Sequence, residues 1–324
     1  MINNTTTNKE FVSLSSGFDK VKAQLCNTLL SAPSVVRSLT QHLSATSGKM
    51  IRAKSLLACS MNDQGQIPKD AIRLALAIEL LHLATLVHDD VIDDAKMRRG
   101  SMTLQKKFGK RPAVICGDYL FCLSLQLAAE TAIDRDRVEM PLTNYMIRIC
   151  LGELMQNLNH KNYNLTTRRY LKIISGKTAA LFEAAFYAGA VLCDEPKNEI
   201  GKYSRLGRYV GMIFQLSDDC IDYEASQDKA KKTVLSDFEQ GVITLPLIYA
   251  FKSEPQLKSK AKSGKVTKDE IRLAVLKHGG LEYTKSVSKK YYKKAIEIID
   301  RLNANSYKKE TLKSILDRAY NGLR

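Results

Sequence analysis

Residues Glu79 to Gly100 read ELLHLATLVHDDVIDDAKMRRG, an apolar run that ends in four aspartates, two arginines and a glycine. Apolar residues in and just before this stretch recur three and four positions apart, which is the period of an α-helix. On such a helix Asp89 and Asp93 are four positions apart, so both carboxylates project from one face. His82 lies two turns earlier, within about 20° of that face at 100° per residue. Charges beside a buried apolar stripe need a counter-charge, so the stretch predicts a helix ending in a cation site.

Taken alone, an acidic run at a helix end is more often a solvated surface than a binding site. A second run changes this weighing. Phe214 to Tyr223 reads FQLSDDCIDY, and its Asp218, Asp219 and Asp222 repeat the Asp-Asp-x-x-Asp spacing after another apolar stretch. Mg²⁺ in proteins is commonly held by one or two carboxylates together with substrate phosphates. The pair of runs therefore indicates a site for a hard divalent cation.

From about Gly48 to its C-terminus, the sequence resembles the trans-polyprenyl diphosphate synthase family. HDDVIDDAKMRRG resembles the family's first aspartate-rich motif, FQLSDDCIDY resembles its second, and QGVITLPLIYA (residues 240–250) resembles the segment that follows. The resemblance implies an all-α isoprenoid synthase fold: an antiparallel helix bundle around a deep central cavity, with the two acidic helices facing each other across its mouth. It also implies the condensation of isopentenyl diphosphate with an allylic prenyl diphosphate, with Mg²⁺ as cofactor.

The composition agrees with a helical protein. The chain has 324 residues with only 17 glycines and 7 prolines, and so few helix breakers favour long helices. We expect one domain over residues 1–324, with residues 1–10 frayed. The seven cysteines include no C-x-x-C pair, which argues against a disulfide framework or a zinc site and favours a cytoplasmic location. The N-terminus lacks a signal-peptide core, and no uninterrupted apolar run reaches the roughly 18 residues of a membrane span.

The formal net charge of +16 predicts attraction to anions, which include diphosphates, nucleic acids and acidic lipid headgroups. The lysines are spread along the chain without interleaved aromatic residues. A nucleic-acid-binding protein would therefore be supported by charge alone, and we expect no nucleic acid partner. We expect membrane contact only transiently, during product release.

The segment Gly48 to Arg52 opens an apolar helix on which Lys49 and Arg52 are neighbours three positions apart. Such basic pairs are common on solvent-facing surfaces. This pair, however, resembles the family's Gly-Lys-x-x-Arg-Pro motif, in which the lysine and arginine hold isopentenyl diphosphate; Ala53 replaces the proline. The resemblance assigns four residues to this substrate: Lys49, Arg52, His82 and Arg99.

His82 also allows two other interpretations. A histidine on an apolar helix can be a hydrogen-bonded core residue. Glu79 and His82 together match the Glu-x-x-His signature of di-iron bundles, but that site needs a second such pair, and no other histidine follows a glutamate at this spacing. We therefore exclude a di-iron site.

Ser175 to Thr178 reads SGKT, and a glycine within a helical stretch predicts a local kink there. By resemblance, Lys177, Arg98 and Lys232 hold the allylic diphosphate, and Thr178 and Gln215 present oxygen dipoles to the developing cation. Lys177, Thr178 and Gln215 form the predicted catalytic set. The predicted metal ligands are Asp89, Asp93 and Asp218, supported by Asp90 and Asp222.

Product length in this family follows cavity depth. Thr85 and Leu81 precede Asp89 by one and two helical turns, and Ala84 lies beside them. Because Thr85 and Ala84 are small, we expect the cavity to stay open beside this helix, in which each turn takes about 3.6 residues. We therefore expect a long-chain product of about six to eight isoprene units, used for a quinone side chain.

Three alternatives remain. A shorter-chain geranylgeranyl or farnesyl diphosphate synthase would share every motif. A class I terpene cyclase would share the fold and first acidic motif, but Lys49, Arg52 and the second motif argue against it. The chain could also be the catalytic subunit of a hetero-oligomeric synthase, so we expect either a homodimer or a heterodimer with a small subunit.

Overall fold

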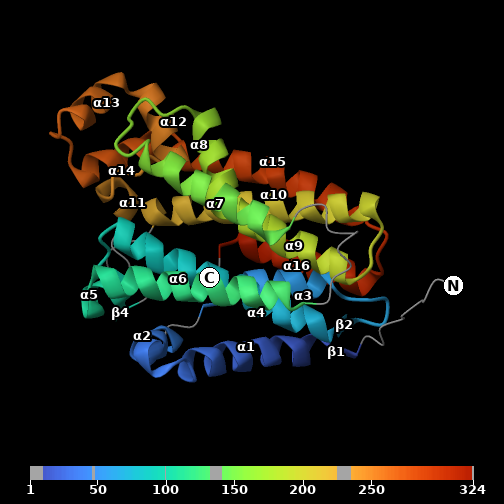
Figure 1. The fold of residues 1–324 in the computed structure, drawn as a ribbon. Helices are drawn as coiled ribbons and strands as arrows, with labels where there is room; N and C mark the ends of the chain where they lie inside the picture. Colours follow the sequence, from blue (N-terminus) through green and yellow to red (C-terminus); the bar gives the residue numbers. More distant parts are fainter. Residues whose placement is uncertain (1–9, 46–47, 99, 132–140, 225–234, 323–324) are drawn as a thin grey trace.

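The computed structural model describes residues 10–45, 48–98, 100–131, 141–224 and 235–322, which fold into a bundle of helices with two very short sheets (Figure 1). In chain order the elements are β1 Phe11–Ser13, α1 Leu14–Leu30, α2 Ser34–Ser44, α3 Ile51–Cys59, β2 Gln66–Pro68, α4 Lys69–Ile92, β3 Met97–Arg98, β4 Ser101–Met102, α5 Leu104–Phe108, α6 Lys110–Ala129, α7 Leu142–Asn157, α8 Thr167–Ile174, the π-helical segment η2 Ser175–Ala179, α9 Ala180–Leu192, α10 Lys197–Glu224, α11 Ser236–Glu239, α12 Leu245–Ser253, α13 Pro255–Lys262, α14 Lys268–Lys277, α15 Gly280–Asp300 and α16 Ser306–Tyr320. The predicted all-α class is confirmed.

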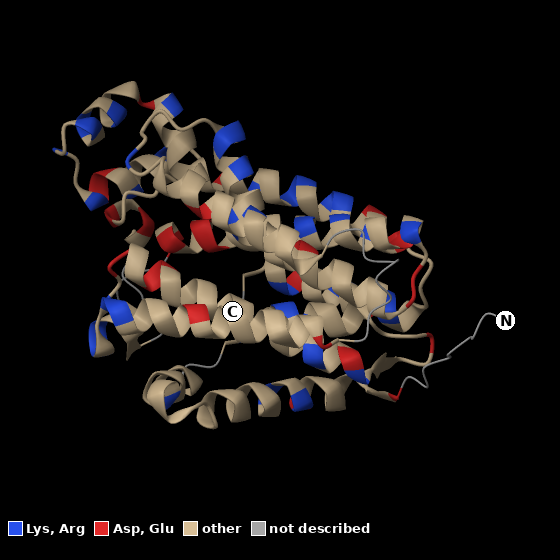
Figure 2. Ribbon diagram, in the orientation of Figure 1, with Lys and Arg blue, Asp and Glu red and all other residues tan. Residues whose placement is uncertain are grey.

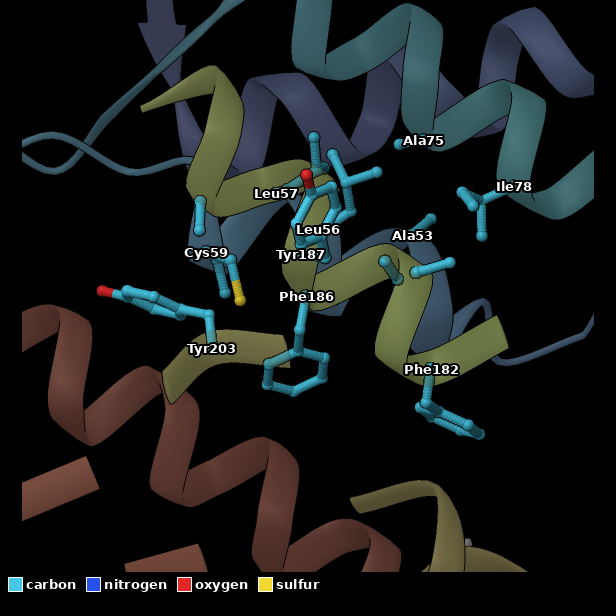
Figure 3. Packing of buried hydrophobic residues seen from close by; sticks show 14 of the residues in the cluster. Ala53, Leu56, Leu57, Cys59, Ala75, Ile78, Phe182, Phe186, Tyr187 and Tyr203 are labelled. Atoms are coloured by element: carbon cyan, nitrogen blue, oxygen red, sulfur yellow. The ribbon is translucent and has the colours of Figure 1, made fainter. Parts of the chain in front are cut away.

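Helix α4 is the core helix of the bundle, with 13 of its 24 residues buried. It packs along α6 on one side and against α3 and α9 on others, while α10 packs between α9 and α15. Figure 3 shows Leu56 and Leu57 of α3 beside Tyr187 of α9 in the main hydrophobic cluster, to which Phe182 and Phe186 of α9 also belong. Each such side chain, when fully buried, contributes about 1.5–3 kcal/mol to stability.

One glycine sets the distance between α3 and α9. A Cβ atom on Gly189 would lie 2.4 Å from the Leu56 carbonyl oxygen. The two backbones therefore approach more closely than any side chain allows, which holds the second half of α3 against α9.

Helices α4 and α6 are each long and apolar enough to cross a membrane. The sequence, which has no uninterrupted apolar run of this length, predicted no membrane span. That prediction is corrected, because a helix of this hydropathy tolerates one or two charged residues. In α4, 67% of the most apolar stretch is buried, as in the core helix of a globular bundle; in α6 only 28% is buried. Length and hydropathy alone are thus weak grounds for a membrane span here.

The spacing of Val12, Phe18, Val21 and Leu25 predicts a helix over residues 11–30, but the chain begins differently. Phe11–Ser13 forms β1, which pairs antiparallel with β2, and α1 begins only at Leu14. The Ser13 side chain accepts a hydrogen bond from the Ser16 amide and so caps the helix there. Residues 1–9 of the segment predicted to be frayed lie outside the described residues, whereas the Glu10 carbonyl accepts a hydrogen bond from the Lys69 amide.

Two further boundaries need correction. Helix α3 begins at Ile51, and Met50 before it has a left-handed backbone conformation. Lys49 therefore lies before the helix, and the predicted spacing of Lys49 and Arg52 on one helix is wrong. The Lys, Ser and Gly residues of 258–267 predict a loop, but this stretch is helical as far as Lys262, because α13 starts at Pro255. Thr267 and Glu270, three positions apart, predict a capping box at the start of the next helix, and this prediction is confirmed.

A buried lysine ties the last helix to the first half of the chain. Lys308 of α16 is only 3% exposed, and its Nζ lies 3.0 Å from Glu195 Oε1 and 2.9 Å from the Met61 carbonyl oxygen, just beyond α3. The Tyr203 hydroxyl donates a hydrogen bond to the same carboxylate. A buried charge needs such partners, so this network holds α16, α10 and the end of α3 together.

Candidate active site

A cavity of about 1460 Å³ lies among α3, α4, α7, η2 and α10. Most of the predicted site residues line it: Lys49, Arg52, His82, Asp89, Asp90, Asp93, Arg98, Lys177, Thr178, Gln215 and Asp218. Arg99 and Lys232 lie outside the described residues. The two acidic stretches, 125 and more residues apart in sequence, thus converge on one cavity, and Figure 2 shows acidic residues gathered near α11, where α4 and α10 end.

The first acidic stretch occupies the end of α4. Asp89 faces the cavity and Asp93 is the residue that ends the helix. Burial raises the pKa of Asp89 to about 7, although Lys177 opposes this shift. Burial also raises the pKa of Asp93. Carboxylates held so close together and partly out of water are poised to bind a cation.

Asp90 has a different environment from its two neighbours. It is 6% exposed and accepts a hydrogen bond of 2.7 Å from Arg98 Nε. This charge-assisted contact fixes the arginine at the rim of the cavity. The geometry therefore makes Asp90 a support for Arg98, whereas the sequence predicted a support for the metal ligands.

The second acidic stretch is arranged by hydrogen bonds on α10. Asp219 is 2% exposed, accepts a hydrogen bond from the Tyr170 hydroxyl and another of 2.8 Å from Gln215 Nε2. Burial raises the pKa of Asp219 to about 7. Asp218 lines the same cavity as Asp219. The hydrogen bonds from Tyr170 and Gln215 thus fix the Asp219 carboxylate at the cavity wall, beside Asp218.

Asp222 does not line the cavity. Its carboxylate accepts hydrogen bonds from the Ser236 amide at 3.1 Å, the Ser236 hydroxyl at 3.0 Å and the Asp237 amide at 3.3 Å. It therefore caps the short helix α11, which contributes Ser236 and Asp237 to the cavity wall. The predicted contribution of Asp222 to metal binding has no geometric support in the described residues.

The three residues predicted to be catalytic lie on two facing segments. The Thr178 hydroxyl donates a hydrogen bond of 2.7 Å to Gln215 Oε1, and the Gln215 amide donates in turn to Asp219. Thr178 and Lys177 belong to η2, whose wider turn confirms the predicted irregularity at Gly176. Such π-helical turns often occur at functional sites because they redirect side chains.

Arg52 of α3 lies against two aromatic rings, and a buried glutamate holds the first turn of the same helix. The Arg52 guanidinium carbon lies 4.5 Å from the centre of the Phe182 ring and 5.8 Å from that of Phe214. Glu79 Oε1 accepts a 2.9 Å hydrogen bond from the Ala53 amide in the first turn of α3. Glu79 is thus used to cap a helix, which agrees with the exclusion of a di-iron site.

The cavity continues from its polar end into an apolar end lined by residues including Leu81, Thr85, Phe121, Met146 and Ile149. Ala84 is not among the lining residues. It is fully buried in a different cluster, which α4 forms with α6. The expectation that Ala84 borders the cavity is therefore wrong, because a step of one residue turns a helical side chain by about 100°.

Three residues near the acidic end were not predicted to act there: Glu153, Tyr170 and Asp237. Asp219 was predicted as part of the second acidic run, but not as one of the metal ligands. Lys177 Nζ lies 2.6 Å from Glu153 Oε2 and 3.9 Å from Asp89 Oδ2. Burial and the neighbouring Asp219 raise the pKa of Asp237 well above its usual range. The only sequence signal for Glu153 was its place after Gly152, and Tyr170 precedes Asp219 by 49 positions.

The donor set fits a hard divalent cation that binds together with a substrate. Within the described ranges, no three His, Cys, Asp or Glu side chains form a metal cage by themselves. Asp89, Asp93 and Asp218 nevertheless offer carboxylate oxygens to one cavity. Mg²⁺ commonly takes one or two carboxylates and completes its shell with water and phosphate oxygens, which suits an open arrangement of this kind.

Comparison with known proteins agrees with this geometry. The polyprenyl synthetase family model matches residues 33–276. Heptaprenyl diphosphate synthase component 2 of Geobacillus stearothermophilus is 34% identical over 268 residues, covering 82% of this chain and 83% of that protein. Heptaprenyl diphosphate synthase from Staphylococcus aureus has a similar structure, with a TM-score of 0.88, 30% identity, and coverage of 96% of this chain and 99% of that one. A polyprenyl synthase from Caulobacter crescentus CB15, complexed with calcium and isoprenyl diphosphate, matches with a TM-score of 0.85 and 28% identity over 95% of each chain.

Proposed function

Because the chain belongs to the polyprenyl synthetase family, whose members are trans-prenyltransferases, we propose that it condenses isopentenyl diphosphate with an allylic diphosphate into a long-chain all-trans polyprenyl diphosphate. The observation that carries this proposal is the convergence of both acidic stretches, with basic side chains between and beside them, at the polar end of one deep apolar cavity. A diphosphate fits the polar end and a growing hydrocarbon fits the apolar end.

In this proposal Asp89, Asp93 and Asp218 hold Mg²⁺. The bound metal supplies charge neutralisation at the departing diphosphate, which makes its C–O bond easier to break. Carboxylates alone would repel that diphosphate, so Lys177 and Arg98 bind its oxygens directly. The hydrogen-bonded pair of Thr178 and Gln215 presents oxygen dipoles to the allylic cation as it forms.

Isopentenyl diphosphate binds beside this site, held by Lys49, Arg52 and His82 in the described part of the chain. Arg52 is already fixed by its contacts with Phe182 and Phe214, so little side-chain entropy is lost on binding. The double bond of isopentenyl diphosphate attacks the allylic cation, and the released diphosphate takes the proton. Arg99 and Lys232 complete the two substrate sites in the family pattern.

We propose a product of about six to eight isoprene units for a quinone side chain; each unit adds about 5 Å of extended chain at about 1.5 Å per bond. Two observations support a long product. Thr85 and Leu81, which line the cavity one and two turns before Asp89, are not aromatic, and the relative from G. stearothermophilus is a heptaprenyl diphosphate synthase component.

The test is to incubate purified protein with Mg²⁺, labelled isopentenyl diphosphate and farnesyl diphosphate, and to size the dephosphorylated lipid. Polyprenols of six or more units are expected. Geranylgeraniol as the longest product would favour the short-chain alternative, and a cyclic hydrocarbon without incorporation of label would favour a terpene cyclase. No incorporation by the chain alone, restored by a second subunit, would establish a partner-dependent synthase.

The proposed partner is a second copy of this chain or a small subunit. Helix α7 exposes Ile147, Leu151, Leu154 and Leu158 along one stripe, and α6 is likewise largely exposed. Apolar stripes of this kind mark contact surfaces. The name "component 2" of the G. stearothermophilus relative supports the heterodimer alternative. Light scattering of the purified chain distinguishes a dimer from a monomer.

We further propose that the enzyme works in the cytoplasm, where its seven free cysteines stay reduced, and meets a membrane only to release product.

A further inference from the structure

Lys177 is anchored by a carboxylate to which the proposed reaction gives no role. Its Nζ lies 2.6 Å from Glu153 Oε2, whereas Asp89 Oδ2, at 3.9 Å, is beyond hydrogen-bond distance. We propose that Glu153 is a positioning residue that holds the Lys177 ammonium where the allylic diphosphate binds. This inference rests on the proposed function and adds a residue to its site.

The backbone is built to bring these two side chains together. Glu153 lies on α7 and Lys177 on η2, and the two segments cross at a pair of glycines. A Cβ atom on Gly152 would lie 2.2 Å from the Lys177 amide nitrogen, and one on Gly176 would lie 3.0 Å from Gly152 Cα. The backbones therefore touch at a point where no side chain fits. The residue that follows Gly152 is consequently placed beside Lys177.

The surroundings of Lys177 are largely buried, which favours a side chain that is held in one position before the substrate binds. The side chains of Lys177 and Glu153 are only 21% and 18% exposed. Burial disfavours the charged amine, but Asp89 and Glu153 outweigh it and raise the pKa of Lys177. A lysine side chain that is free to move loses rotamer entropy when it binds the substrate. The 2.6 Å contact with Glu153 holds the Lys177 side chain in place before the substrate arrives.

Glu153 could act on catalysis in two ways with opposite signs. If it only neutralised Lys177, replacing it with glutamine would leave a stronger cation and tighten diphosphate binding. If it positions Lys177, the same replacement would misplace the ammonium by an ångström or more. Misplacement of that size can cost about a hundredfold in rate while substrate still binds. The direction of the change therefore decides between the two roles.

The decisive variant is Glu153→Gln, which keeps the size of the side chain. We expect kcat to fall about tenfold or more, with the KM for geranyl diphosphate unchanged or higher. In a Lys177→Ala background the same substitution should change kcat by less than about twofold, because its effect passes through the lysine. A lower KM at unchanged kcat, or a full additional loss in the Lys177→Ala background, would overturn the proposal.

The helix crossing gives a second test with a matched control. Gly152→Ala should lower kcat in the same way, since a Cβ would push η2 away from α7. Gly201→Ala is the control, because nothing lies within 4 Å of a Cβ there, and it should leave kcat unchanged. If Gly152→Ala does not fold, Glu153→Asp replaces it: the shorter carboxylate should give a kcat between those of wild type and Glu153→Gln. Wild-type kcat in Glu153→Asp and Glu153→Gln alike would contradict the inference.

A binding measurement keeps this inference separate from the proposed function. Calorimetric titration of wild type and Glu153→Gln with inorganic pyrophosphate in the presence of Mg²⁺ requires no turnover. Unchanged or weaker binding by the variant supports positioning, and tighter binding refutes it. Failure of the wild type to elongate any prenyl diphosphate would count against the proposed function alone, while this titration would still decide the role of Glu153.

Discussion

Replacing Thr85 with phenylalanine should shorten the product. Thr85 lines the cavity four residues before Asp89, which places it about 6 Å further down at 1.5 Å per residue. Each isoprene unit adds four chain bonds, about 5 Å when extended at about 1.5 Å per bond. A ring at this position therefore leaves room for a primer of only about one or two units below the level of the carboxylates. Because each condensation adds one unit, we expect the main product to fall from about six to eight units to about three.

The assay uses geranyl diphosphate as primer, so that the blocked cavity can still accept it, with labelled isopentenyl diphosphate, and sizes the products by reversed-phase chromatography. Two controls separate the causes. Thr85→Val removes the 2.8 Å hydrogen bond from the Thr85 hydroxyl to the His82 carbonyl but keeps the shape, so product length should not change. Ala84→Val adds bulk on the side facing α6 and should cost about 1–3 kcal/mol of stability without shortening the product. Full-length product from Thr85→Phe, or equal shortening by Ala84→Val, would refute the cavity model.

Three further predictions concern the site and the core. Asp89→Asn should reduce kcat at least about a hundredfold while the far-ultraviolet circular dichroism stays unchanged, and wild-type turnover at saturating Mg²⁺ would contradict the metal assignment. Lys308→Met should lower the free energy of unfolding by about 3–5 kcal/mol, because it leaves the Glu195 carboxylate buried without its cation. The control Lys309→Met should lower it much less. Equal midpoints of urea unfolding for the two variants would show that the buried pair has no such role. Burial raises the pKa of Asp89 and of Asp219 from 3.8 to about 7, so the folded protein binds protons that the unfolded chain does not. In the presence of a chelator, the Tm should therefore fall as the pH rises from about 4 to about 7. A Tm that rises through this window would show that these carboxyls are not buried as described.

The helical core and the acidic ends of α4 and α10 could be predicted from sequence because each depends on local periodicity. A stripe of apolar residues and aspartates at fixed spacing remain visible in one stretch of chain. The different contacts of Asp89, Asp90 and Asp93 could not be predicted from such local patterns. Asp90 supports Arg98 because the chain turns back after α4, which no local pattern encodes.

Contacts between distant segments account for the remaining differences. Asp219 is held by Tyr170, and Asp222 caps α11, so the roles of the second acidic stretch depend on residues 49 positions before it and 14 positions after it. Glu153 acquires its contact only where α7 crosses η2. Ala84 and Thr85 look alike in sequence, and only the packing of α6 decides which of them faces the cavity. The roles of Arg99 and Lys232, and the extent of the domain over all 324 residues, stay predictions.

The lysine of α16 has a consequence for shortened forms of this chain. Lys308 holds the carbonyl of Met61, just beyond α3, and the Cys193 thiol donates a hydrogen bond of 3.0 Å to the same carbonyl. A chain without α16 would therefore keep the contact between α3 and α9 but would leave the Glu195 carboxylate buried without its cation. We expect such a chain to be less stable although every residue that lines the cavity is still present, because all of them precede α16.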